Sequence, residues 1–182
     1  IDAVFLVFDI GNEDLPAVMS AFRAMDGWDS TTVTMPCKQA IIPFLDDLSP
    51  EAKLSGAVNV VKKEVDGRIV GYNADGAGFM NNLINHHVKI TGSTMTLLGP
   101  GGAGSAILAQ AALDGVARID AFARKGGSSY TEAFALKERI EQATSCKVNI
   151  YPFEDEAQLK RSIEESDILA NCTTVGMGSG NT

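Results

Sequence analysis

The stretch that decides the fold runs Thr94-Met95-Thr96-Leu97-Leu98-Gly99-Pro100-Gly101-Gly102-Ala103-Gly104-Ser105-Ala106-Ile107. A short apolar strand leads into Gly-x-Gly-x-x-Gly, and an alanine-rich helix follows at once. In such a turn Gly99 allows the tight bend, Gly101 lets the backbone approach a pyrophosphate, and Gly104 lets helix and strand pack closely. The helix N-terminus adds free N–H groups and partial positive charge for phosphates. The pattern predicts a dinucleotide-binding loop whose cofactor contacts are Gly99, Gly101, Gly102, Ala103 and Gly104. A glycine turn that serves packing alone is the other interpretation.

The second half of the chain alternates strands and helices. The hydrophobic pattern predicts strands at 94–98, 119–123, 148–151 and 167–170, and helices at 105–113, 130–143 and 156–165. The helix at 105–113 is apolar nearly all round, so we expect it to be buried on two sides. This alternation implies right-handed crossovers and a parallel sheet. The fold class is therefore α/β, with a Rossmann-type NAD(P)-binding domain over residues 89–182.

The first half predicts a smaller α/β domain over residues 1–88, to which we assign substrate binding. Its expected strands are 3–8 and 31–35, its expected helices 15–25, 38–47 and 76–87, and Val65-Asp66-Gly67 turns a hairpin between 57–63 and 68–72. Ser49 caps a helix that Pro50 opens. Pro43 should kink the helix at 38–47 unless it lies near a helix start. Turn residues at 90–93 mark the boundary between the domains.

Both ends of the chain cut into predicted structure. The chain begins at Ile1 inside a strand-like run, and it ends at Thr182 shortly after another strand. We therefore expect the first domain to lack its start and the second domain to lack its end.

Composition excludes several classes of protein. The net charge is −8 with no cluster of lysine and arginine, which argues against a nucleic-acid partner. No run approaches the roughly 18 apolar residues of a membrane span. Without a signal-peptide pattern the expected location is the cytoplasm. The three cysteines, Cys37, Cys146 and Cys172, form no C-x-x-C, and the only histidines are His86 and His87, so we expect neither a zinc site nor a disulfide framework.

Five blocks in order carry a family resemblance. They are Thr32–Lys38 (TVTMPCK), Gly56–Asn59 (GAVN), Gly71–Gly76 (GYNADG), the glycine loop, and Asn171–Met177 (NCTTVGM). Together they resemble shikimate dehydrogenases, and the resemblance spans essentially the whole chain. The residues around Met35-Pro36 and at 109–119 are most similar to the branch that also accepts quinate.

The resemblance implies an NADP-dependent oxidoreductase that acts on a CH–OH group. Its reaction is the reversible reduction of 3-dehydroshikimate to shikimate in aromatic amino acid biosynthesis. By the same resemblance Lys38 and Asp75 are the catalytic pair, and Thr34, Asn59 and Asp75 bind the substrate. Hydride transfer to a ketone leaves an alkoxide, which a lysine ammonium can stabilise and protonate. An aspartate beside that lysine would orient the ammonium.

The residues after the fourth strand of the second half should reach the cofactor. Ligands of parallel sheets lie outside the carboxyl ends of the strands. We therefore expect Thr173, Val175 and Met177 to line the nicotinamide side.

The choice between NADP and NAD depends on the end of the second strand of that sheet. A site specific for NAD usually has an acidic residue there, which binds the ribose 2′-hydroxyl. The chain has Arg124 and Lys125 instead, which can grip a 2′-phosphate through charge-assisted hydrogen bonds. NADP is favoured. NAD stays possible, because NADP-specific relatives usually carry Asn-Arg-Thr at this turn.

Three questions stay open at this level. Thr32 stands where strict shikimate dehydrogenases usually have asparagine, so a quinate/shikimate dehydrogenase that uses NAD or NADP is the first alternative. A ligand-sensing module that kept the fold and lost catalysis is the second alternative, and intact Lys38 and Asp75 argue against it. The expected partner is a small-molecule substrate, and the expected oligomeric state is a monomer or a homodimer.

Overall fold

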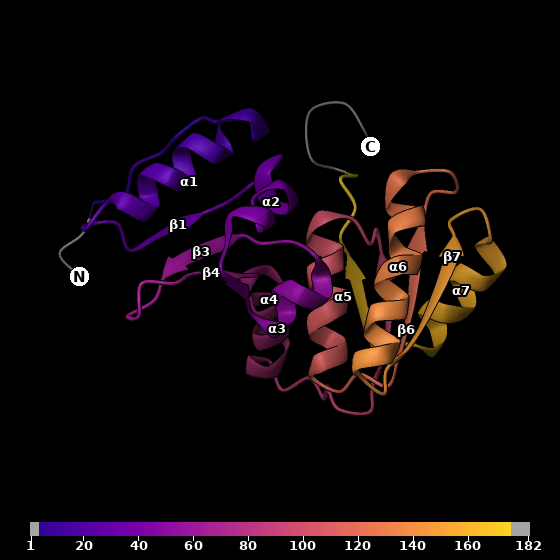
Figure 1. The fold of residues 1–182 in the computed structure, drawn as a ribbon. Helices are drawn as coiled ribbons and strands as arrows, with labels where there is room; N and C mark the ends of the chain where they lie inside the picture. The colour runs from indigo at the N-terminus through magenta and orange to yellow at the C-terminus, as the bar shows by residue number, and fades with distance from the viewer. Residues whose placement is uncertain (1–3, 176–182) are drawn as a thin grey trace.

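The computed structural model describes residues 4–175 and divides into two sheets of four strands each (Figure 1). The first half contains η1 Asn12–Asp14, α1 Leu15–Ala24, β1 Ser30–Thr32, α2 Cys37–Ala40, η2 Ile42–Phe44, β2 Asp47–Leu48, α3 Pro50–Ser55, β3 Val60–Lys63, β4 Ile69–Tyr72 and α4 Ala74–Asn85. The second half contains β5 Thr94–Leu98, α5 Gly102–Leu113, β6 Arg118–Ala123, α6 Ser128–Ala143, β7 Lys147–Pro152, α7 Glu156–Glu165 and β8 Ile168–Asn171.

The second sheet is fully parallel, with strand order β7-β6-β5-β8. This confirms the predicted α/β fold class, and the observed bounds differ from the predicted ones by at most three residues. The chain proceeds outward from β5 to β7 and then returns to place β8 on the other side of β5. The connections therefore reverse direction between β5 and β8, which is where ligands of such sheets bind.

Helix α5 is buried on most of its surface, as its apolar composition predicts. Its buried residues include Ile107, Leu108, Ala111 and Ala112. On one side it contacts β5, and on the other it contacts α3 and α4 of the first half (Figure 1). Leu54 of α3 and Met80 of α4 belong to the same hydrophobic core as Leu108. The two halves thus meet along α5.

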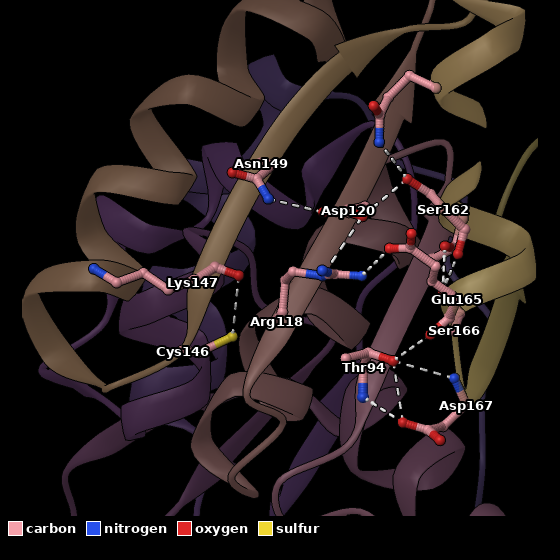
Figure 2. Close-up of polar contacts among 12 residues, drawn as sticks. Thr94, Arg118, Asp120, Cys146, Lys147, Asn149, Ser162, Glu165, Ser166 and Asp167 are labelled. Carbon is pink, nitrogen blue, oxygen red and sulfur yellow. Dashed lines mark hydrogen bonds and ion pairs between the residues drawn. The ribbon is translucent and has the colours of Figure 1, made fainter. Parts of the chain in front are cut away.

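A cluster of hydrogen-bonded polar side chains links α7 to the second sheet (Figure 2). Asp120 of β6 is only 4% exposed, and its two carboxylate oxygens accept hydrogen bonds from Asn149 (2.8 Å) and Ser162 (2.9 Å). The guanidinium of Arg118 lies 3.7 Å from the same carboxylate. A buried carboxylate is tolerated only with such partners. Sequence periodicity predicted the strand but not this cluster, because hydrogen-bond partners come from three separate elements.

A second carboxylate aligns the starts of β5 and β8. Asp167 accepts a hydrogen bond from the backbone N–H of Thr94 (2.8 Å) and another from the Thr94 hydroxyl (3.1 Å) (Figure 2). These bonds, above all the backbone one, hold the pKa of the Asp167 carboxyl below its usual value. This contact helps to fix the register in which β8 pairs with β5, and β8 ends at the candidate cofactor edge of the sheet.

The first sheet is mixed and has the order β1-β3-β4-β2. Strands β3 and β4 form the predicted hairpin, with Gly67 at φ +87° in its turn. Ser49 caps α3 by accepting a hydrogen bond from the Ala52 N–H (3.4 Å), as predicted. A separate core beneath this sheet includes Leu15, Met19, Val58, Val61 and Ile69.

Two predictions for the first half are wrong. The predicted strand at 3–8 forms no ladder in its described part, and Phe5 and Val7 are 75% and 86% exposed, since no described strand lies beside this segment. The predicted helix at 38–47 ends at Ala40. Pro43 supplies no N–H, so the chain continues as the short 3₁₀ turn η2 and then enters β2. The strand predicted at 31–35 is shorter, at Ser30–Thr32.

Within residues 4–175 no helix is long and apolar enough to cross a membrane.

Candidate active site

Lys38 and Asp75 form an ion pair although 37 positions separate them in the chain. The Lys38 Nζ lies 2.7 Å from the Asp75 Oδ2. Lys38 belongs to the short helix α2, and Asp75 lies in the first turn of α4. The side chains are 21% and 33% exposed, so the pair is reachable from solvent yet partly screened from it. The fold therefore brings together the two residues that the resemblance implies are catalytic.

Asn59 holds the second oxygen of the same carboxylate. Its side-chain N–H₂ donates to the Asp75 Oδ1 at 2.7 Å, and its side-chain oxygen accepts from the Ala74 N–H at 2.8 Å. The backbone of Asn59 bonds to Tyr72 on one side and to Val33 on the other. Sheet hydrogen bonds thus place Asn59, and Asn59 in turn orients Asp75. Both oxygens of Asp75 are occupied by donors that can also face a ligand.

Asn73 is part of this arrangement, although it was not among the predicted catalytic or binding residues. Its side chain is 2% exposed and caps α4 by accepting from the Asp75 N–H at 3.2 Å. Its N–H₂ group donates to the Ala57 carbonyl at 3.0 Å. An asparagine directly before a helix is a recognisable N-cap signal. Asn73 therefore anchors the turn that presents Asp75.

Thr34 and Cys37 precede Lys38 in the chain and are joined by a backbone hydrogen bond. Thr34 is exposed, and its backbone carbonyl accepts from the Cys37 N–H at 2.9 Å. Thr34 also lines an apolar groove that runs between the 5–10 segment and β1, together with Thr32 and Val33. The Cys37 thiol is buried in the first core, where it packs as a small apolar side chain.

Of the other two cysteines, Cys146 is buried and Cys172 is partly buried. Burial raises the pKa of the Cys146 thiol to about 11 and also raises the pKa of the Cys172 thiol. Both are free thiols. Among residues 4–175 no group of three or more histidine, cysteine or acidic side chains is arranged to hold a metal ion.

The glycine loop has the geometry that its spacing predicts. Gly99 has φ +84°, a conformation that favours glycine. A Cβ on Gly104 would lie 2.0 Å from the Gly99 carbonyl oxygen, so only glycine allows α5 to start this close to β5. Gly101 is extended, and no side chain caps α5. A Cβ on Gly102 would meet no atom within 4 Å, and Ala103 is exposed. The first turn of α5 is therefore open to a ligand.

Two further predicted cofactor segments reach the same edge of the sheet. Arg124 and Lys125 follow β6, are exposed, and form no ion pair with any residue that the structure describes. Thr173 follows β8, and its Cγ2 would lie 3.1 Å from a Cβ on Gly99. Val175 is 68% exposed. Met177, the remaining predicted cofactor residue, lies outside the described residues.

Known proteins share both this fold and these blocks. Residues 1–61 match the family model described as the shikimate dehydrogenase substrate binding domain. The chain is 44% identical over 179 residues to the shikimate dehydrogenase (NADP(+)) of Listeria monocytogenes serotype 4b (strain F2365), which covers 97% of this chain. The chain belongs to the shikimate dehydrogenase family. It spans 60% of the length of that relative and of the corresponding enzyme from Streptococcus uberis, to which it is 40% identical.

Solved structures of similar proteins agree with the observed fold. The crystal structure of shikimate 5-dehydrogenase from Listeria monocytogenes in complex with shikimate and NAD superposes with a TM-score of 0.88 at 44% identity. It covers 93% of this chain, and the chain covers 58% of it. The ligand-free 5-ketofructose reductase of Gluconobacter sp. strain CHM43 superposes with a TM-score of 0.76 at 29% identity, over 93% of this chain and 57% of that one.

Proposed function

We propose that this member of the shikimate dehydrogenase family catalyses the reversible, NADP-dependent reduction of 3-dehydroshikimate to shikimate. The observation that carries the proposal is the Lys38–Asp75 ion pair of 2.7 Å, in which Asn59 donates a hydrogen bond to the other oxygen of the Asp75 carboxylate. The names of the most similar relatives support the same activity. The resemblance and these contacts agree on the same residues.

The chemistry assigned to Lys38 follows from its position. Reduction of a ketone adds a hydride to carbon and a proton to oxygen. A Lys38 ammonium beside the carbonyl oxygen stabilises the developing negative charge and delivers the proton from Nζ. The Asp75 Oδ2 accepts one ammonium hydrogen and so directs another toward the substrate. In the reverse direction the same nitrogen accepts the proton of the alcohol.

Substrate binding is assigned to Thr34, Asn59 and Asp75. The hydroxyl groups of shikimate need both donors and acceptors, which a threonine hydroxyl, an amide and a carboxylate supply together. Asn59 and Asp75 are joined at 2.7 Å, so one hydroxyl can bridge them. A site built to hydrogen-bond a substrate hydroxyl rejects analogues that lack that hydroxyl.

The glycine loop and its neighbours are assigned to NADP. The uncapped first turn of α5 and the open space at Gly102 suit a pyrophosphate. Arg124 and Lys125 are exposed cations at the same sheet edge and suit the 2′-phosphate. When bound, the nicotinamide supplies the hydride. Thr173, Val175 and Met177 would line its ring, and the glycine loop would hold the phosphates.

We assign substrate binding to residues 1–88 and cofactor binding to residues 89–182. The two sheets and two separate hydrophobic cores support this division. Leu54 and Met80 of the first segment pack into the second core, so the two units are joined by a shared apolar contact. We expect a monomer or a homodimer, which sedimentation of the full-length protein distinguishes.

The test follows nicotinamide absorbance with shikimate and with quinate, each with NADP and with NAD, in the full-length protein. The proposal expects turnover of shikimate with NADP, lowered by roughly 10²–10⁴-fold in Lys38→Ala. Turnover of quinate, or a preference for NAD, would instead favour the quinate/shikimate branch and implicate Thr32, which is exposed at the end of β1. Cofactor binding without turnover of either acid would support the ligand-sensing alternative.

A further inference from the structure

At Gly76 the helix that carries Asp75 packs directly against the backbone of the helix that begins at the glycine loop. Gly76 directly follows Asp75 and is buried. A Cβ built on Gly76 would lie 2.3 Å from the Ala106 carbonyl oxygen and 2.8 Å from the Gln110 Cβ. Ala106 belongs to α5, two positions after Gly104. The contact therefore joins the first turn of α4 to the second turn of α5, and the two helices lie side by side in Figure 1.

The rest of the α4–α5 interface fixes the same spacing. No other pair of described helices packs so extensively. Met80, one turn beyond Gly76, shares a core with Ile107 and Ala111. Because such cores are close-packed, the two helices can approach this closely only if nothing projects between them at Gly76.

We propose that Gly76 is a positioning residue for hydride transfer. Its missing side chain sets the separation between α4 and α5, and so the distance between the substrate held at Lys38–Asp75 and the nicotinamide held at the glycine loop. The inference rests on the proposed function, since it needs both ligands in the places assigned above. It adds a residue that neither touches a ligand nor follows from the catalytic pair.

The size of the effect follows from the contact distances. Contacts at 3.4 Å and beyond are ordinary van der Waals contacts, whereas the added Cβ would start at 2.3 Å from a backbone oxygen. The helices must therefore separate by about 1 Å, because backbone of a buried helix cannot rotate away as a flexible side chain does. A misplacement of about 1 Å can cost roughly a hundredfold in rate. Asp75 moves with α4, whereas the glycine loop stays with α5.

Gly78 provides a matched control in the same helix. It is exposed, and a Cβ built on it would meet no atom within 4 Å. Gly76→Ala and Gly78→Ala therefore make the same chemical change and give α4 the same gain in helix propensity. Only the first change inserts an atom between the helices.

The experiment compares the two variants in the full-length protein. It measures kcat, the separate dissociation constants of shikimate and NADP, and the isotope effect with shikimate deuterated at the reacting carbon. For Gly76→Ala we expect kcat to fall by roughly ten- to a hundredfold, with each dissociation constant within about threefold of wild type. The isotope effect should rise, because hydride transfer becomes the slower step. Gly78→Ala should match wild type in all three.

Several results would overturn the inference. A merely structural role would lower kcat through a smaller folded fraction, leaving the isotope effect unchanged. Wild-type kcat in Gly76→Ala would also refute it while leaving the proposed function intact. If the wild-type enzyme turns over no shikimate, the proposed function itself fails. If Gly76→Ala does not fold, Gln110→Val decides, since it adds a second γ-carbon to the Cβ that faces Gly76. A raised isotope effect there supports the inference, and an unchanged one overturns it.

Discussion

Replacing Asn73 by alanine removes two separate supports of the Asp75 turn. The side-chain oxygen caps α4 at the Asp75 N–H, and the N–H₂ group satisfies the Ala57 carbonyl. Loss of an asparagine cap costs about 1 kcal/mol of stability. The buried Ala57 carbonyl keeps a hydrogen bond from the Ser55 hydroxyl (3.3 Å), so losing its shorter bond from Asn73 costs about 0.5–1.5 kcal/mol. We therefore expect Asn73→Ala to lower the free energy of unfolding by roughly 1.5–2.5 kcal/mol.

Two further variants separate these contributions. Asn73→Ser keeps a capping oxygen but loses the donor to Ala57, so the free energy of unfolding should fall by about 0.5–1.5 kcal/mol. Asn81→Ala makes the same asparagine-to-alanine change at an exposed position of α4 and should change the free energy of unfolding by less than about 1 kcal/mol. Urea unfolding of the full-length protein, followed by circular dichroism, measures all three.

Activity supplies an independent readout for Asn73. Because its side chain anchors the Asp75 N–H, the alanine variant should lose more kcat than its unfolded fraction explains. The reasoning fails if Asn73→Ala unfolds at the same urea concentration as Asn81→Ala. It also fails in part if stability drops while kcat per folded molecule stays at the wild-type value, since Asp75 would then need no anchor.

Three other predictions address the pair, the cofactor and acid stability. Lys38→Ala should lower kcat by roughly 10²–10⁴-fold with a much smaller change in KM for shikimate, measured by steady-state kinetics; near-normal turnover excludes the proposed role. Arg124→Ser should raise KM for NADP by about tenfold and leave KM for NAD unchanged, which initial rates with each cofactor check. The hydrogen bond from Arg23 holds the pKa of the Asp46 carboxyl below its ordinary value of 3.8. The stabilisation from this ion pair is therefore present above pH 3.8 and lost as the pH falls below it. Asp46→Asn should make the free energy of unfolding depend less on pH in the acid range, measured by urea unfolding at several pH values.

The second half of the fold was predictable because its signals are local. Each parallel strand is a short apolar run between a helix and a turn, and the glycine loop marks the junction between a strand and a helix. The first half was less predictable. The apolar run at 3–8 has the composition of a strand, but a strand exists only where a neighbour supplies hydrogen bonds. The helix predicted at 38–47 failed because Pro43 interrupts it.

The candidate site divides in the same way. The resemblance identified Lys38, Asn59 and Asp75 from three separate blocks and implied that Lys38 and Asp75 act as a pair, but it did not show which atoms meet. The structure shows both Asp75 oxygens occupied, and it shows Asn73 fixing the turn beneath them.

The sequence by itself determined the α/β class and the glycine loop, because residue type and short-range spacing encode these features, and its family resemblance singled out Lys38 and Asp75. Only the tertiary structure decided which distant groups share a hydrogen bond and how closely two helices approach. Gly76 illustrates the difference. In the sequence it is one of several glycines in the chain. Only the structure shows that the Ala106 carbonyl oxygen, on another helix, leaves no room for a side chain at this position.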